Sequence, residues 1–188
     1  TVTSARVVCL ADWQAGPDPD GLVSHILNLK VQVVDLLKAE QPDVLYVVGM
    51  GDLIEGCGNQ HYAMQDWAVA AGGLNGRRDQ VKLVRRLLVD LLTEWARHVD
   101  RIVVGAVPGN HGEGRRDGKA FSTFEDNDDV AVVEQVAEIL AANEDAYGHV
   151  RFALPDGDMS LTLDVAGTTV GFIHGHQART GGATPRQK

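Results

Sequence analysis

This chain of 188 residues is poor in several features that mark other protein classes. It has two cysteines, Cys9 and Cys57, and two isolated cysteines in a chain of this length suggest no disulfide framework. Lysine and arginine total 17 against 26 acidic residues, so the formal charge of -9 does not favour extended binding to a nucleic-acid backbone. Because no apolar run approaches roughly 20 residues and no signal peptide precedes the first strand, we expect a cytoplasmic protein without a membrane partner.

What the chain does contain is enough apolar sequence for one core. Hydrophobic residues make up 44% of the composition, and internal repeats, low-complexity tracts and obvious linkers are absent from the sequence. Length and composition together predict a single domain.

The hydrophobic periodicity predicts strands that alternate with helices and are followed by a group of adjacent strands. Strands are expected at 6–11, 44–51, 102–107, 151–154, 159–165 and 168–173, and helices at 22–40, 77–99 and 129–143. Residues 53–76 are expected to form an irregular loop with a short helix around 62–71, and residues 109–128 a second loop. A turn at Ala166 and Gly167 would join the last two strands. This order predicts an α/β layered sandwich with a mixed sheet.

Four polar residues each follow the end of a short apolar run. They are Asp12, Asp52, Asn110 and His174. In an open α/β sheet, ligands bind beyond the carboxyl ends of the strands, so these side chains can meet although the sequence separates them widely. Two carboxylates, an amide and an imidazole in one place would make a metal site.

The local motifs have ordinary alternatives. Gly51-Asp52 and Gly109-Asn110-His111 are also typical of turns, because glycine permits sharp backbone bends beside a polar residue. A lone strand-end histidine such as His174 is more often a satisfied polar residue than a ligand. The alignment of all these residues at strand ends favours the metal site over separate turns.

Taken together and in order, the motifs resemble those of the calcineurin-like metallophosphoesterase family. That family has an Asp-x-His, a Gly-Asp, a Gly-Asn-His followed by an acidic residue, a strand-end His and a final Gly-His-x-His. The matching residues here are Asp12, Gly51-Asp52, Gly109-Asn110-His111 and His174. The resemblance implies two mixed β-sheets packed face to face with helices outside, an α-β-β-α sandwich.

Three departures from the family pattern stand out. Gln14 takes the place of the first histidine, and Gly112 with Glu113 replaces the acidic residue expected directly after His111. The segment Gly175-His176 has only the first half of the final motif. We therefore expect residues 1–188 to be one metallophosphoesterase domain that is cut short before its last motif.

The resemblance also implies a role for each matching residue. Asp52 would bridge two divalent ions, with Asp12 and Gln14 on the first and Asn110 and His174 on the second. A metal-bridged hydroxide would attack a phosphoester, and His111 would donate a hydrogen bond or a proton to the substrate oxygen. The ligands suit manganese, iron, zinc or nickel, and the neutral Gln14 favours manganese; alternatively, Gln14 only supports a ligand through a hydrogen bond.

Further residues on the same loops are weaker candidates. Glu113, Arg115 and His176 are additional candidates for the site, while Glu55, Cys57, His61 and Arg116 are solvated loop residues in the simpler interpretation. The expected partner is a phosphoester substrate, either a nucleotide, a nucleic acid or a phosphoprotein. A phosphodiesterase or nuclease-like activity is our first expectation, and a phosphatase is included. The alternative is a non-catalytic binding module with an incomplete metal site.

Overall fold

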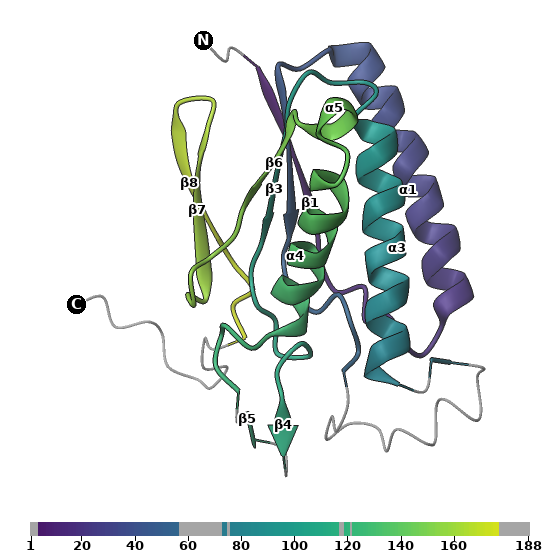
Figure 1. Ribbon diagram of the computed structural model, residues 1–188, viewed down its shortest axis with the longest axis vertical. Coiled ribbons are helices and arrows are strands. Elements are labelled where there is room, and N and C mark those ends of the chain that lie inside the picture. The colour runs from purple at the N-terminus through teal and green to yellow at the C-terminus, as the bar shows by residue number, and fades with distance from the viewer. Residues whose placement is uncertain (1–3, 57–72, 75, 117–118, 121, 177–188) are drawn as a thin grey trace, which may run out of the picture.

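A central sheet of four parallel strands organises the molecule (Figure 1). The computed structural model describes residues 4–56, 73–74, 76–116, 119–120 and 122–176. The sheet has the order β1-β2-β3-β6, and its strands are β1 (Ala5–Leu10), β2 (Val44–Gly49), β3 (Ile102–Ala106) and β6 (Val150–Ala153). Because all four strands are parallel, the loops that follow them leave from the same edge of the sheet.

Helices cover one face of this sheet. They are α1 (Pro19–Glu40), α3 (Arg77–Trp95), α4 (Asp128–Ala141) and the short α5 (Glu144–Tyr147). Figure 1 shows α1, α3 and α4 side by side on the right of the sheet. Alternate residues of β2, Leu45 and Val47, point into the core beneath them, which also contains Trp95 of α3.

A hairpin lies on the opposite face of the sheet, on the left in Figure 1. It consists of β7 (Ser160–Val165) and β8 (Thr168–Ile173), which pair antiparallel with each other. Its residues Leu161 and Phe172 form a second apolar cluster with Tyr46 of β2, whose hydroxyl donates to the carbonyl of Asp164 at 2.8 Å. Strand β2 is therefore buried along its whole length, because both of its faces are covered.

Local residues determine where α1 begins and ends. The Asp18 carboxylate accepts a hydrogen bond from the N–H of Gly21 at 2.9 Å, and Pro19 occupies the first turn, where its missing N–H costs nothing. Gln41 ends the helix in the left-handed region at φ 46°. The helix thus begins slightly before the predicted start near Gly21.

Most of the predicted elements are confirmed with shifts of a few residues, including the turn at Ala166 and Gly167, where φ is 52° and 86°. The four-stranded sheet is parallel, however, and the antiparallel pairs among the described strands form separate two-stranded sheets, so the two directions do not mix within one of these sheets. The predicted loop at 109–128 contains two short strands, β4 (Arg115–Arg116) and β5 (Lys119–Ala120). The short helix expected around 62–71 lies outside the described residues. None of the helices in the described ranges is long and apolar enough to cross a membrane.

Candidate metal centre

The loops after β1 and β2 hold their polar residues in a strained backbone conformation. Asp12, Gln14 and Asp52 all have positive φ, at 53°, 43° and 55°, which is uncommon for residues other than glycine. Backbone hydrogen bonds join the two loops, from Asp12 N–H to Gly51 O at 3.2 Å and from Gln14 N–H to Asp52 O at 2.9 Å. Such strain tends to gather at functional sites, where the surrounding structure maintains it.

Glycine is needed where these loops approach the loop after β3. Gly51 has φ of 90°, and a Cβ atom there would lie 2.8 Å from Gly109 Cα and 2.9 Å from His174 Nδ1. A Cβ on Gly109 would lie 2.3 Å from the Asp52 Oδ1 atom. The absence of side chains at both positions lets the strand-end loops and the end of β8 meet.

Three candidate ligands converge at this place. Asp12, Asp52 and His174 each offer one ligand atom, and these atoms all lie within 4.8 Å of one another. Asp52 is only 3% exposed, whereas Asp12 is open to solvent. The candidates follow the ends of β1, β2 and β8, so the carboxyl edge of the parallel sheet meets the end of the hairpin here.

The hydrogen bonds of His174 define its proton arrangement. Its Nδ1 atom lies 2.8 Å from the Met50 carbonyl oxygen, which only accepts, so Nδ1 carries the proton. In a neutral ring, the Nε2 atom then carries a lone pair. This atom lies 3.2 Å from Asp52 Oδ2 and 3.2 Å from Asn110 Oδ1. Either a proton on Nε2 or a metal ion among these three atoms would join them. This is the pattern of a metal-binding histidine whose other nitrogen donates to a carbonyl.

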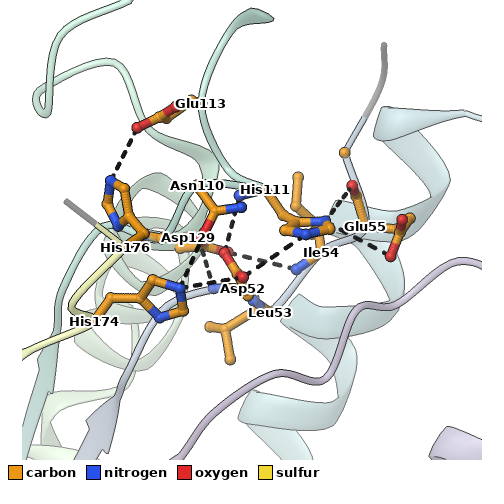
Figure 2. Close-up of polar contacts among 12 residues, drawn as sticks. Asp52, Leu53, Ile54, Glu55, Asn110, His111, Glu113, Asp129, His174 and His176 are labelled. Carbon is orange, nitrogen blue, oxygen red and sulfur yellow. Dashed lines mark hydrogen bonds and ion pairs between the residues drawn. The ribbon is translucent and has the colours of Figure 1, made fainter. Parts of the chain in front are cut away.

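His111 lies on the other side of Asp52 from His174 (Figure 2). Its backbone N–H donates to Asp52 Oδ1 at 2.9 Å, and its Nδ1 donates to the Glu55 carbonyl at 3.0 Å. The remaining nitrogen, Nε2, lies 3.8 Å from Asp52 Oδ2, and the His111 side chain as a whole is mostly shielded from solvent. This nitrogen therefore borders the place where the ligand atoms converge.

A buried carboxylate that the sequence analysis did not identify, Asp129, supports the loops. Asp129 is in the first turn of α4 and fully buried, and it accepts hydrogen bonds from four backbone N–H groups, those of Asp52, Leu53, Ile54 and Gly109, at 2.9 to 3.4 Å. Burial, and secondly the charge of Asp52, raise the pKa of Asp129 to about 6, while the hydrogen bonds from the backbone oppose that rise.

Asn127, at the N-terminus of α4, completes this support. Its side chain accepts from Asp129 N–H at 3.0 Å and donates to the Gly109 carbonyl at 2.9 Å. The sequence does carry a signal for Asn127, because Asn just before an apolar helical pattern is a typical cap. It carries none for the contacts of Asp129, whose partners in the Asp52 loop are 75 to 77 residues away.

The additional candidates occupy different places. Glu113 and His176 meet each other, with Glu113 Oε1 3.1 Å from His176 Nε2 (Figure 2). Gln14 contacts Asp52 through its backbone, and it also lines a cavity beside Asp12. Glu55 is buried rather than solvated, at 4% exposure. The side chains of Arg115 and Arg116, together with Cys57 and His61, lie outside the described part.

Comparison of the sequence with protein-family models and with curated proteins finds no match.

Proposed function

We propose that this protein is a metal-dependent phosphoesterase of the calcineurin-like type. The observation that carries the proposal is the convergence of the His174 Nε2 lone pair with Asp52 Oδ2 and Asn110 Oδ1, each at 3.2 Å, beside the Asp12 carboxylate. A neutral His174, a carboxylate and an amide oxygen in this arrangement offer a divalent cation three donor atoms at one point. The packing of the β7–β8 hairpin on the sheet face opposite the helices supports the proposed layered α-β-β-α sandwich.

In this proposal two divalent ions would be held by residues of the site. Asp12 and Gln14 would serve one ion, Asn110 and His174 the other, and Asp52 would contribute to both. Bound divalent ions supply Lewis-acid activation of water and neutralise charge on a phosphoryl group. Carboxylate, amide and imidazole donors without thiolate are compatible with manganese, iron, zinc and nickel, and the neutral donor at Gln14 favours manganese.

The chain's own residues have distinct parts in the reaction. The backbone N–H of His111 fixes Asp52 Oδ1, which keeps the Asp52 carboxylate directed at its neighbours. With its Nδ1 proton donated to the Glu55 carbonyl, His111 would donate from Nε2 to the substrate oxygen only when its ring carries a second proton, and in that form it would supply a hydrogen bond or a proton. Asp129 and Asn127 position the two loops that carry Asp52 and Asn110. The substrate is a phosphodiester or phosphomonoester, and the net charge of -9 disfavours long polyanions.

The test measures metal content and hydrolysis in the same samples. We expect the manganese-loaded protein to hydrolyse bis(nitrophenyl) phosphate or nitrophenyl phosphate, with the activity removed by a chelator and restored by Mn²⁺. Asp52→Asn should lower both metal content and activity, because Asp52 contributes to both ion sites. Asp156→Asn, on an exposed loop, is the matched control and should change neither.

Two results would contradict the proposal. Full metal content in Asp52→Asn would remove Asp52 from its bridging role. Metal binding without hydrolysis of either ester would favour the alternative, a non-catalytic binding module.

A further inference from the structure

A cavity of about 560 Å³ opens beside the candidate metal centre. It lies between the end of β1 with its following loop and one side of α1. Asp12 belongs to both places, since it lines the cavity and its carboxylate also lies within 4.8 Å of the ligand atoms of Asp52 and His174. A phosphoryl group at the metal centre would therefore have this cavity next to it.

The wall formed by α1 is a single stripe of that helix. Leu22, His25 and Leu29 follow one another at intervals of three and four residues, so they share one face. The stripe remains accessible because, among the described strands, β1 is at the edge of the four-stranded sheet and pairs with β2 alone. Trp13, on the loop after β1, adds an aromatic wall.

The charges of the cavity restrict its ligand. Its residues include two carboxylates, Asp12 and Asp18, and neither lysine nor arginine is among the described residues that line it. A second phosphate group in the part of the cavity away from the metal centre would meet Asp18 with no lysine or arginine among the described lining residues, which is unfavourable. Apolar walls from Trp13, Leu22 and Leu29, with polar groups from Gln14 and His25, instead suit an uncharged organic group.

We infer that this cavity, which we name the β1–α1 pocket, binds the organic part of the substrate. The substrate class is a small phosphoester with a nucleoside-sized, uncharged organic group and a single phosphate. The size is consistent, because pockets for compact organic ligands span about 300 to 1,000 Å³. The inference rests on the proposed phosphoesterase function and narrows it. A polynucleotide is disfavoured, because a further phosphate in this pocket would meet the Asp18 carboxylate.

Three chromogenic esters test the inference with the full, manganese-loaded chain. They are thymidine nitrophenyl phosphate, the same ester with a second phosphate on its sugar, and methyl nitrophenyl phosphate. We expect the thymidine ester to have a KM about tenfold below that of the methyl ester, equivalent to about 1.4 kcal/mol of added binding. The ester with a second phosphate on its sugar should have a KM about tenfold above that of the thymidine ester.

Two filling variants and one control locate the effect. Leu29→Trp, and independently His25→Trp at an exposed position, should raise the KM of the thymidine ester about tenfold relative to that of the methyl ester, because the larger ring fills the pocket. Val31→Trp is the matched control on the same helix, since Val31 is 57% exposed and does not line the pocket. It should leave the ratio of the two KM values unchanged.

The outcomes separate this inference from the proposed function. Equal changes for both esters in the two filling variants would overturn the pocket as the binding site. A KM for the doubly phosphorylated ester below that of the thymidine ester would overturn the inference in favour of a polynucleotide substrate. A KM for a phosphoserine peptide below that of the thymidine ester would overturn it in favour of a phosphoprotein substrate. If no ester is hydrolysed, the proposed function fails. Equilibrium dialysis with thymidine then tests the pocket alone, where binding that is lost in Leu29→Trp but kept in Val31→Trp supports it and an absence of binding overturns it.

Discussion

Two histidines near Asp52, His174 and His111, each carry a proton on Nδ1. Nδ1 of His174 donates to the Met50 carbonyl, and Nδ1 of His111 donates to the Glu55 carbonyl. Both carbonyls belong to the chain segment around Asp52. As a result, the Nε2 atoms of the two rings approach the same carboxylate oxygen, at 3.2 Å from His174 and 3.8 Å from His111.

The difference between the two rings predicts different effects of substitution. Because His111 lies outside the group of converging ligand atoms, His111→Ala should leave metal content nearly intact. Loss of a general acid should lower kcat by about 100- to 10,000-fold on phenyl phosphate, whose leaving group needs a proton. The loss should be smaller on nitrophenyl phosphate. Steady-state kinetics with elemental analysis of the same samples checks both expectations.

The control for this prediction is His98→Ala, because His98 bonds to Glu94 at the end of α3, away from the site. It should retain full activity. Equal losses in His111→Ala on both esters would indicate charge stabilisation in place of proton transfer, and undiminished activity on both would remove His111 from the mechanism.

At the scale of elements, the N-terminus of α4 is the support of the site. Asn127 is 1% exposed, and its side chain both caps α4 and satisfies the Gly109 carbonyl. Asn127→Ala should therefore lose a cap and also leave a buried carbonyl unpaired. Together these effects predict a loss of about 2 to 4 kcal/mol in the free energy of unfolding, measured by urea denaturation.

Two further variants separate the contributions. Asn143→Ala removes a similar cap from the exposed start of α5 and should cost about 1 kcal/mol or less. Asn127→Asp keeps the acceptor for the helix but loses the donor to Gly109, so its stability should fall between those of Asn127→Ala and the unsubstituted chain. If Asn127→Ala and Asn143→Ala cost the same, the contact with Gly109 contributes nothing.

The elements also show how far the sequence determines the structure. Helices and buried strands were predictable because their apolar residues repeat with a clear period, and Asp12, Asp52 and His174 were predictable because they end such runs. The four-residue α5 and the two-residue β4 and β5 are too short to show a period. The β1–α1 pocket depends on which strand is at the edge, and the contacts of Asp129 depend on tertiary pairing, so neither could be predicted from local pattern.

For the molecule as a whole, the fold gathers carboxylates at one edge of its sheet. Asp52, Glu55, Glu113 and Asp129 are all buried near the candidate centre, although charged groups are rarely buried without partners. Hydrogen bonds from the backbone to Asp129 and the Glu113–His176 contact offset part of this cost. The repulsion that remains among these buried carboxylates should make the metal-free protein less stable than the metal-loaded one.

The pKa of Asp129 is raised first by burial and secondly by the charge of Asp52, and this shift makes the stability depend on pH. In the metal-free protein its pKa is about 6 against an ordinary value of 3.8, so the folded state binds this proton more tightly than the unfolded state. The contribution of this bound proton to the free energy of unfolding is therefore complete below pH 3.8, and it is lost as the pH rises through about 6. Two pKa units correspond to at most about 3 kcal/mol.

Urea unfolding of chelator-treated protein across this pH range tests the prediction. The free energy of unfolding should decline less steeply with pH in Asp129→Asn than in the unsubstituted chain, whatever its absolute stability, because the titrating group is gone. Asp128→Asn, the matched control, removes the ion pair with Arg77 but keeps Asp129, so its decline should match that of the unsubstituted chain. Burial, the larger cause of the raised pKa of Asp129, would remain in the presence of Mn²⁺, but a cation on Asp52 would offset the second cause, the charge of Asp52, and should therefore reduce the decline in part. An equally steep decline in Asp129→Asn would show that another group binds the proton.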